Sequence, residues 1–127
     1  DPVLSGRLGA AMVIGLGSGD LSREYATIAT LKHFLAYAVP EGGQNGNYAS
    51  VGTRDLHENF LPPFREAIDA GALSVMTSYN SIDGVPCTAN HYLLHNYCVT
   101  SGDSVALLFR IYIVLKESMK VTLLPLL

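Results

Sequence analysis

Two stretches, TLKHF (residues 30–34) and SVMTSYN (residues 74–80), decide how this chain is expected to fold. Each comes at the end of an apolar run and places polar side chains where a β-strand is expected to stop. In barrels of parallel strands, the edge at which the strands end is where the chemistry takes place. The two stretches therefore predict a functional site at one edge of a parallel sheet.

Helical and strand-like patterns alternate around these two stretches. The expected order is helix, strand, helix, strand, helix, at residues 4–16, 26–31, 53–68, 73–78 and in a segment capped by Asn90 that carries Tyr92, Leu93 and Leu94. Such an alternation is typical of βα units around a parallel sheet. We therefore expect an α/β fold.

Glycine and proline set the expected boundaries of these elements. The glycines within residues 15–19 are expected to stop the first helix, and Thr53 is the expected N-cap of the second. Pro62 and Pro63 should break or restart that second helix, because proline lacks the N–H that a helix interior needs. Residues 40–52 have turn chemistry without periodicity, and Asp83 with Gly84 predicts a turn.

Composition narrows the possible partners. The chain has 127 residues, a net charge of -3 and eight basic residues that are scattered singly, so we expect no nucleic-acid partner. Its most apolar stretch, residues 105–115, is interrupted by Arg110 and falls short of the roughly 20 residues of a membrane span, so we expect no membrane partner. The sequence begins at Asp1 without an apolar leader, so we expect any targeting segment to be removed or absent, and localisation stays open.

Potential metal and cofactor motifs are incomplete. His91, His95 and Cys98 fall at i, i+4 and i+7 on one helical face, but neither a general-base glutamate nor a fourth ligand accompanies them. Two solvated histidines beside a buried cysteine are the simpler interpretation, and a metal-binding helix is the lower-ranked alternative. The glycines within residues 15–19 lack the spacing of a dinucleotide cradle. We expect no metal and no other cofactor, while two cysteines allow at most one disulfide.

Several segments resemble, in order, motifs of glycoside hydrolase family 3, whose members are chiefly β-glucosidases. The resembling segments are DPVLSG (1–6), KHF (32–34), VPEGGQN (39–45), VGTRDL with FLPPF (51–56 and 60–64), and GALSVM through YN to DGVPC (71–87). The family counterparts are EDPYLSG, KHF, VPEGGRN, VGxRELxxxFLPPF and GALSVMSAYNxIDGVPC. The resemblance covers residues 1 to about 95.

This resemblance implies a partial (β/α)8 TIM-barrel-like domain that binds the terminal sugar of a β-linked glucoside or oligosaccharide. It implies that Lys32 and His33 hydrogen-bond sugar hydroxyls, that Met76 lines the pocket, and that Tyr79 contacts the nucleophilic carboxylate. Family enzymes are retaining glycosidases with two carboxyl groups roughly 5 Å apart. The resemblance also implies a secreted or extracellular protein.

Simpler interpretations exist for each of these residues. His33 could satisfy backbone groups at a strand end, and Met76 and Tyr79 could belong to the core. Glu41 and Arg54 could face a substrate, but we interpret Glu41 as solvated and Arg54 as structural. Asp55, Glu58, Glu66 and Asp69 are expected on the solvent face of their helix.

The sequence departs from the family pattern after His95. The family nucleophile lies in a Ser-Asp-Trp/Tyr motif about thirty residues beyond Cys87, but no such motif is present, and the only later carboxylates are Asp103 and Glu117. The family's general acid/base comes from a second domain. We therefore expect residues 1–95 to be a central part of the barrel domain and 96–127 a divergent tail, which a frameshift or missplicing would explain.

The leading function is a fragment of a retaining β-glucosidase-type glycoside hydrolase that carries part of the sugar subsite but is inactive alone. The alternative is a non-catalytic carbohydrate-binding or non-functional product. A β-xylosidase relationship, the sugar, the linkage and the oligomeric state stay open.

Overall fold

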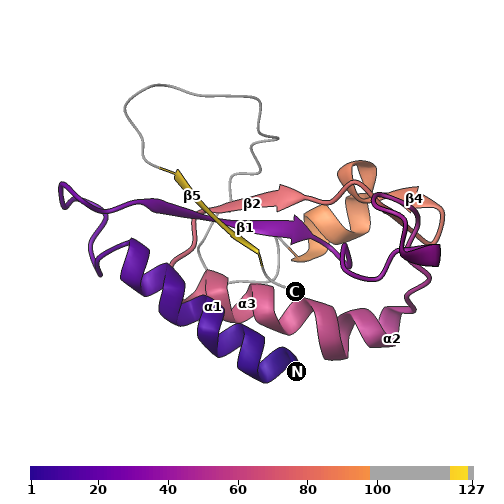
Figure 1. Ribbon diagram of the computed structural model, residues 1–127, viewed down its shortest axis with the longest axis horizontal. Helices are drawn as coiled ribbons and strands as arrows, with labels where there is room; N and C mark the ends of the chain where they lie inside the picture. Colours follow the sequence, from indigo (N-terminus) through magenta and orange to yellow (C-terminus); the bar gives the residue numbers. More distant parts are fainter. Residues whose placement is uncertain (98–120, 126–127) are drawn as a thin grey trace.

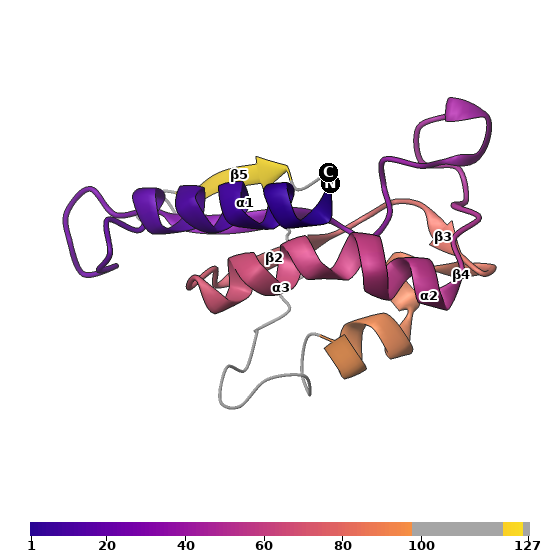
Figure 2. The same ribbon diagram turned by 90° about the horizontal axis from the view of Figure 1, so that it is seen from below.

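The computed structural model describes residues 1–97 and 121–125, which form a helical layer packed on a small sheet (Figure 1). Helices α1 (Pro2–Leu16) and α3 (Leu61–Asp69) lie together on one face of the sheet, as the second view also shows (Figure 2). The strands are β1 (Ile28–Phe34), β2 (Ser74–Thr77) and β5 (Val121–Pro125), in the order β2-β1-β5. Both pairings are parallel, which confirms the predicted α/β class.

The register between β1 and β2 places the TLKHF stretch (residues 30–34) beside the start of the SVMTSYN stretch (residues 74–80). The paired residues are Thr30 with Ser74, Leu31 with Val75, Lys32 with Met76 and Phe34 with Thr77. Because alternate strand residues face opposite sides, Lys32 and Met76 share one face of the sheet and Leu31 and Val75 the other. Leu31 and Val75 are buried, whereas Lys32 and Met76 are half-buried.

The predicted strand at residues 26–31 is displaced from the observed one. Strand β1 runs from Ile28 to Phe34, so Lys32 and His33 lie within the strand and not after it. Pairing with β2 continues to Thr77 across an irregularity between Lys32 and Phe34. The polar side chains therefore do not end the strand, because the backbone pairing of the neighbouring strand outweighs the local sequence pattern.

Helix α1 begins earlier than the predicted start at residue 4. The side chain of Asp1 accepts hydrogen bonds from the main-chain N–H groups of Val3 and Leu4, at 2.9 and 3.2 Å. Pro2 occupies the first turn, where its missing N–H costs nothing. The helix ends at Leu16 with Gly17 as its C-cap, close to the predicted stop.

The helical backbone changes type before Pro62 and Pro63 but does not break, so the predicted break or restart is only partly right. Helix α2 (Thr53–Asp55) leads into a wide π-helical turn, η2 (Leu56–Phe60), and α3 begins at Leu61 with proline in its first turn. The predicted N-cap is wrong: Gly52 occupies that position and gives no side-chain hydrogen bond, while Thr53 is already helical.

The core lies between the helices and the sheet. Phe34 of β1 meets Phe64 of α3 edge to face, with ring centroids 5.1 Å apart. Leu31 and Ala67 are fully buried in the same cluster. This packing fixes the carboxyl end of β1 against α3.

The segment after β2 contains a short hairpin and a helical turn. Strands β3 (Ser81–Ile82) and β4 (Val85–Pro86) are antiparallel, and Asp83 and Gly84 form the predicted turn between them. The short helices η3 (Cys87–Ala89) and η4 (Tyr92–Tyr97) follow. Asn90 caps η4 as predicted, because its Oδ1 accepts from the N–H of Leu93 at 3.1 Å.

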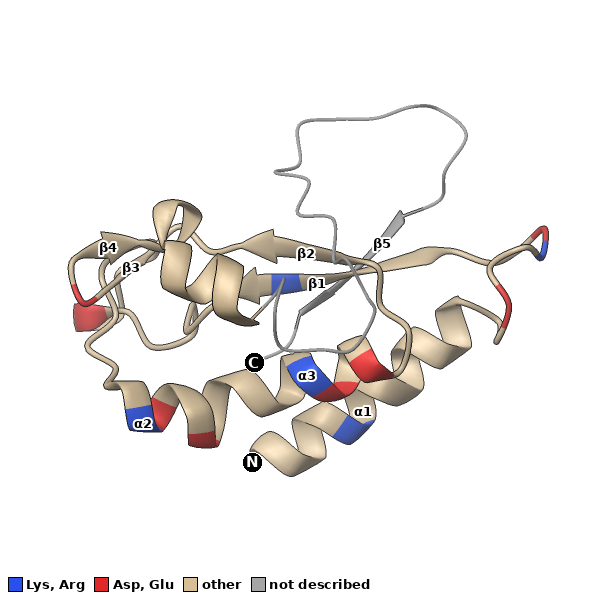
Figure 3. Ribbon diagram, turned by 180° about the vertical axis from the view of Figure 1, so that it is seen from behind, with Lys and Arg blue, Asp and Glu red and all other residues tan. Residues whose placement is uncertain are grey.

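Charged residues of both signs are interspersed along α2 and α3 (Figure 3). Asp55, Glu58 and Asp69 are exposed, as predicted, but Glu66 is half-buried because it packs against Gly6 of α1. Within residues 1–97 and 121–125, no helix is long and apolar enough to cross a membrane.

Candidate functional site

The predicted site residues come from the carboxyl ends of β1 and β2. Lys32 and His33 are the fifth and sixth residues of β1, while Met76 is on β2 and Tyr79 lies two residues beyond its end. Because the strands are parallel, these ends lie at the same edge of the sheet. The peptide bonds Lys32–His33 and Phe34–Leu35 are cis.

Three aromatic rings gather at this edge. The rings of His33 and Tyr37 have centroids 4.7 Å apart and are tilted by 54°. The rings of Tyr37 and Tyr79 have centroids 6.0 Å apart, edge to face. Tyr37 thus links His33 to Tyr79, a residue that is 77% exposed. Sequence reasoning missed Tyr37, because a tyrosine a few residues after a strand is not diagnostic of a site.

His33 lies in an environment that favours its neutral form. Partial burial, and secondarily the positive charge of Lys32, lowers the pKa of His33 below its ordinary value of 6.5. A neutral imidazole offers one donor and one acceptor, and a lysine ammonium offers three donors. Lys32 and neutral His33 therefore offer both hydrogen-bond donors and an acceptor.

A buried polar cluster ties the end of β1 to the segment that carries Tyr79. The carbonyl oxygen of Leu35 accepts from Ser78 Oγ at 3.1 Å and from Asn80 Nδ2 at 3.2 Å, and Cys87 Sγ lies 3.7 Å away. The N–H of Ser78 also donates to the carbonyl of Phe34 at 2.7 Å. These bonds fix the main chain on both sides of Tyr79.

Asn80 is the most enclosed member of this cluster. Its side chain is fully buried, and its Oδ1 has no hydrogen-bond partner among the described residues. Sequence reasoning did not single it out, because an asparagine after a strand is equally typical of an ordinary turn.

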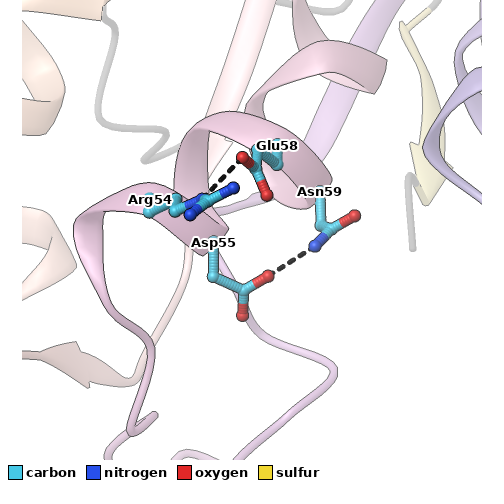
Figure 4. Close-up of polar contacts among 4 residues, drawn as sticks. All are labelled: Arg54, Asp55, Glu58 and Asn59. Carbon is cyan, nitrogen blue, oxygen red and sulfur yellow. Dashed lines mark hydrogen bonds and ion pairs between the residues drawn. The ribbon is translucent and has the colours of Figure 1, made fainter.

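Glu41 and Arg54 belong to elements other than β1 and β2. Arg54 is exposed on α2, where its Nε contacts Glu58 Oε1 at 2.8 Å, one residue from the Asp55–Asn59 hydrogen bond (Figure 4). Glu41 begins the short helix η1 (Glu41–Gly43) and is half-buried, so the expectation of a solvated side chain is only partly right.

The predicted metal-binding face is described only in part. The rings of His91 and His95 are stacked with centroids 4.7 Å apart, but Cys98 lies outside the described residues. Among residues 1–97 and 121–125, no group of three histidine, cysteine or acidic side chains could hold a metal ion. Cys87 is a buried free thiol.

Comparison with known proteins identifies the family. The model of the glycosyl hydrolase family 3 N terminal domain matches residues 1–98, which is more than half of the chain. The chain belongs to glycosyl hydrolase family 3. A β-xylosidase of Formosa agariphila is 42% identical over 97 residues, which cover 74% of this chain and 13% of that relative.

Two further proteins are similar to this chain over three quarters or more of its length. The crystal structure of a β-glucosidase from Listeria innocua in complex with glucose has a TM-score of 0.72 and 42% identity over 76% of this chain and 14% of its own. A β-xylosidase/α-L-arabinofuranosidase of Medicago sativa is 36% identical over 127 aligned residues, covering 87% of this chain and 16% of the relative. That match extends beyond the 98 residues of the domain, and the division expected at residue 95 stays a prediction. The chain spans about 13% of the length of the Formosa agariphila β-xylosidase.

Proposed function

We propose that this chain carries part of the sugar subsite of a β-glucosidase-type family 3 hydrolase. Lys32, His33, Met76 and Tyr79 are the proposed substrate-binding residues. The ligand is the terminal sugar of a β-linked glucoside or oligosaccharide. The observation that carries the proposal is the gathering of His33 and Tyr79 around Tyr37, at the edge where β1 and β2 end.

The chemistry of these residues suits a sugar. Each hydroxyl of a pyranose both donates and accepts, and Lys32 with neutral His33 offers donors and an acceptor together. The apolar faces of a pyranose suit the half-buried thioether of Met76 and the exposed ring of Tyr79. A site that satisfies hydroxyls also rejects ligands that lack them, since its own polar groups would be left unpaired.

The surrounding fold supports a barrel origin for the site. Strands β2, β1 and β5 are parallel, with α1 and α3 on one face of their sheet, which is the arrangement of βα units in a (β/α)8 barrel. The Listeria innocua β-glucosidase, which is 42% identical to this chain over the aligned residues, has been solved in complex with glucose. A mutant of the same enzyme has been solved in complex with laminaribiose. These complexes favour a glucosyl residue, while the Formosa agariphila relative keeps xylose as the second candidate.

The proposed site binds but does not cleave. A retaining glycosidase needs two carboxyl groups, one as nucleophile and one as acid/base. The Ser-Asp-Trp/Tyr motif that carries the family nucleophile does not occur among the 127 residues. Binding by the chain alone is therefore proposed to be weak and hydrolysis absent.

A calorimetric or NMR titration with glucose tests this proposal. The chain should bind glucose weakly, and both Lys32→Met and His33→Gln should weaken binding by about tenfold, as the loss of a hydrogen bond to a polar ligand does. His91→Gln is the matched control, because His91 is an exposed histidine of the segment that leads into η4. No binding by the unaltered chain, or equal losses in the control, would contradict the proposal. Hydrolysis of an aryl β-glucoside by the purified chain would contradict its catalytic part.

A further inference from the structure

Tyr37 has a second contact in addition to its place between two rings. Its hydroxyl donates a short hydrogen bond to Oδ1 of Asn45, eight residues later. Asn45 lies in the segment of residues 40–48, which we name the 40–48 loop. The same side chain therefore touches both the predicted site and this loop.

The 40–48 loop is closed by its own hydrogen bonds. The N–H of Glu41 donates to the carbonyl of Tyr48 at 2.9 Å, and Nδ2 of Asn47 donates to the carbonyl of Glu41 at 3.1 Å. Gly42, Gly43 and Gly46 have φ angles of 65°, 67° and 80°, and residues other than glycine seldom adopt this backbone conformation. A loop bonded to itself in this way keeps its shape, so an anchor at one residue positions the whole segment.

The loop also lies directly against Tyr79. A Cβ placed on Gly46 would be 3.7 Å from the Cβ of Tyr79, which is ordinary van der Waals contact. Tyr37 and Tyr79 are themselves edge to face. Asn45 and Gly46 therefore lie beside the two tyrosines, and the loop borders the ring cluster.

We propose that Tyr37 is a positioning residue that holds the 40–48 loop as a side wall of the sugar subsite. The proposal rests on the proposed function of that subsite. The ring of Tyr37 sets the spacing between His33 and Tyr79, and its hydroxyl fixes Asn45. The wall encloses a single pyranose ring held by Lys32 and His33, so its loss lowers affinity without removing the hydrogen bonds of those two residues.

The test measures glucose affinity by NMR titration of the 127-residue chain and of four variants. Tyr37→Phe removes only the hydroxyl, and Asn45→Ala removes its acceptor. The double variant measures whether the two changes act through one bond. Asn45→Asp restores an acceptor oxygen, and Tyr48→Phe is the matched control because it removes an exposed hydroxyl from the same loop.

The expected result is a weakening of about three- to tenfold for Tyr37→Phe and for Asn45→Ala, with no larger loss in the double variant. Asn45→Asp and Tyr48→Phe should stay within about twofold of the unaltered chain. Amide hydrogen exchange at residues 44–47 should accelerate in the first two variants, without sugar present. Equal glucose affinity in all variants would overturn this inference and leave the proposed function intact. A chain that binds no glucose at all would overturn both.

Discussion

The side-chain amide of Asn80 donates to the main-chain carbonyl of Leu35 at 3.2 Å, and so joins the ends of the two strands that carry the candidate site. The hydrogen bond that joins the ends of β1 and β2 lies in the protein interior, since Asn80 is fully buried. Residues exposed at the rim, such as Tyr79, thus rest on a buried polar support.

Replacing Asn80 by alanine should lower the free energy of unfolding by about 1–3 kcal/mol, because a buried hydrogen bond is lost and one donor to the Leu35 carbonyl is removed. Urea denaturation followed by circular dichroism measures the change. Asn59→Ala is the matched control: its amide bonds Asp55 on an exposed helical surface, so its change should be below about 0.5 kcal/mol. An equal decrease in the free energy of unfolding for both variants would show that the buried hydrogen bond of Asn80 stabilises the fold no more than an exposed one.

Gly15→Ala should raise the free energy of unfolding by about 0.5–1 kcal/mol. The residue lies inside α1, and an added Cβ meets nothing within 4 Å, so only the helix-favouring effect of alanine remains. Gly6→Ala should gain less, because its Cβ would clash with the carboxylate of Glu66 and force that side chain to move. Thermal and chemical unfolding of the two variants measure the difference. A larger gain at Gly6 than at Gly15 would contradict the described contact between α1 and α3.

Tyr97 should ionise later than an ordinary tyrosine. Burial, followed by the hydrogen bond with Tyr92, raises the pKa of Tyr97 to about 12 from an ordinary value of 10. The folded state then holds its proton between pH 10 and 12 while the unfolded state loses it. This contribution to stability is therefore complete below pH 10 and declines above it.

Absorbance at the tyrosinate band during an alkaline titration measures this ionisation. The chain has seven tyrosines, and the late step near pH 12 should disappear in Tyr97→Phe. Tyr25→Phe, at a residue that is 76% exposed, is the comparison variant and should keep the late step. A late step that survives in Tyr97→Phe would contradict the assignment.

His33 should titrate below pH 6.5, because burial and then the charge of Lys32 lower its pKa. Between that lowered pKa and 6.5 the unfolded state binds more protons, so stability falls as the pH falls through this window. NMR titration of the imidazole signals measures the midpoint. Lys32→Met should raise the midpoint part of the way toward 6.5, since it removes only the smaller of the two causes. A titration midpoint of His33 at or above pH 6.5 in the unaltered chain would contradict the lowered pKa.

The element order could be predicted because its signals are local. Pro62 and Pro63 lie in the first turn of α3, and Asn90 caps η4, through backbone chemistry that depends only on neighbouring residues. The bounds of β1 could not be predicted, because Lys32 and His33 remain in the strand through pairing with β2, more than forty residues away. Pairing of this kind is not visible in a window of a few residues.

The candidate site was only partly predictable for the same reason. Lys32, His33, Met76 and Tyr79 could be named as members of motifs, and their roles in binding stay predictions. Tyr37 and Asn80 act through contacts made by the fold: one links two rings and a loop, and the other bonds a carbonyl 45 residues earlier in the chain. Neither residue type is diagnostic in sequence, since tyrosine is common in cores and asparagine in turns.

The most direct test of a sugar subsite at this edge is glucose titration of the isotope-labelled chain with assigned NMR signals. Signals of His33, Tyr37 and Tyr79 should shift together and saturate with one dissociation constant, while the ring signals of His91 and His95 should not move. Shifts confined to residues outside the edge of β1 and β2, or the absence of any saturable shift, would contradict the proposed sugar subsite.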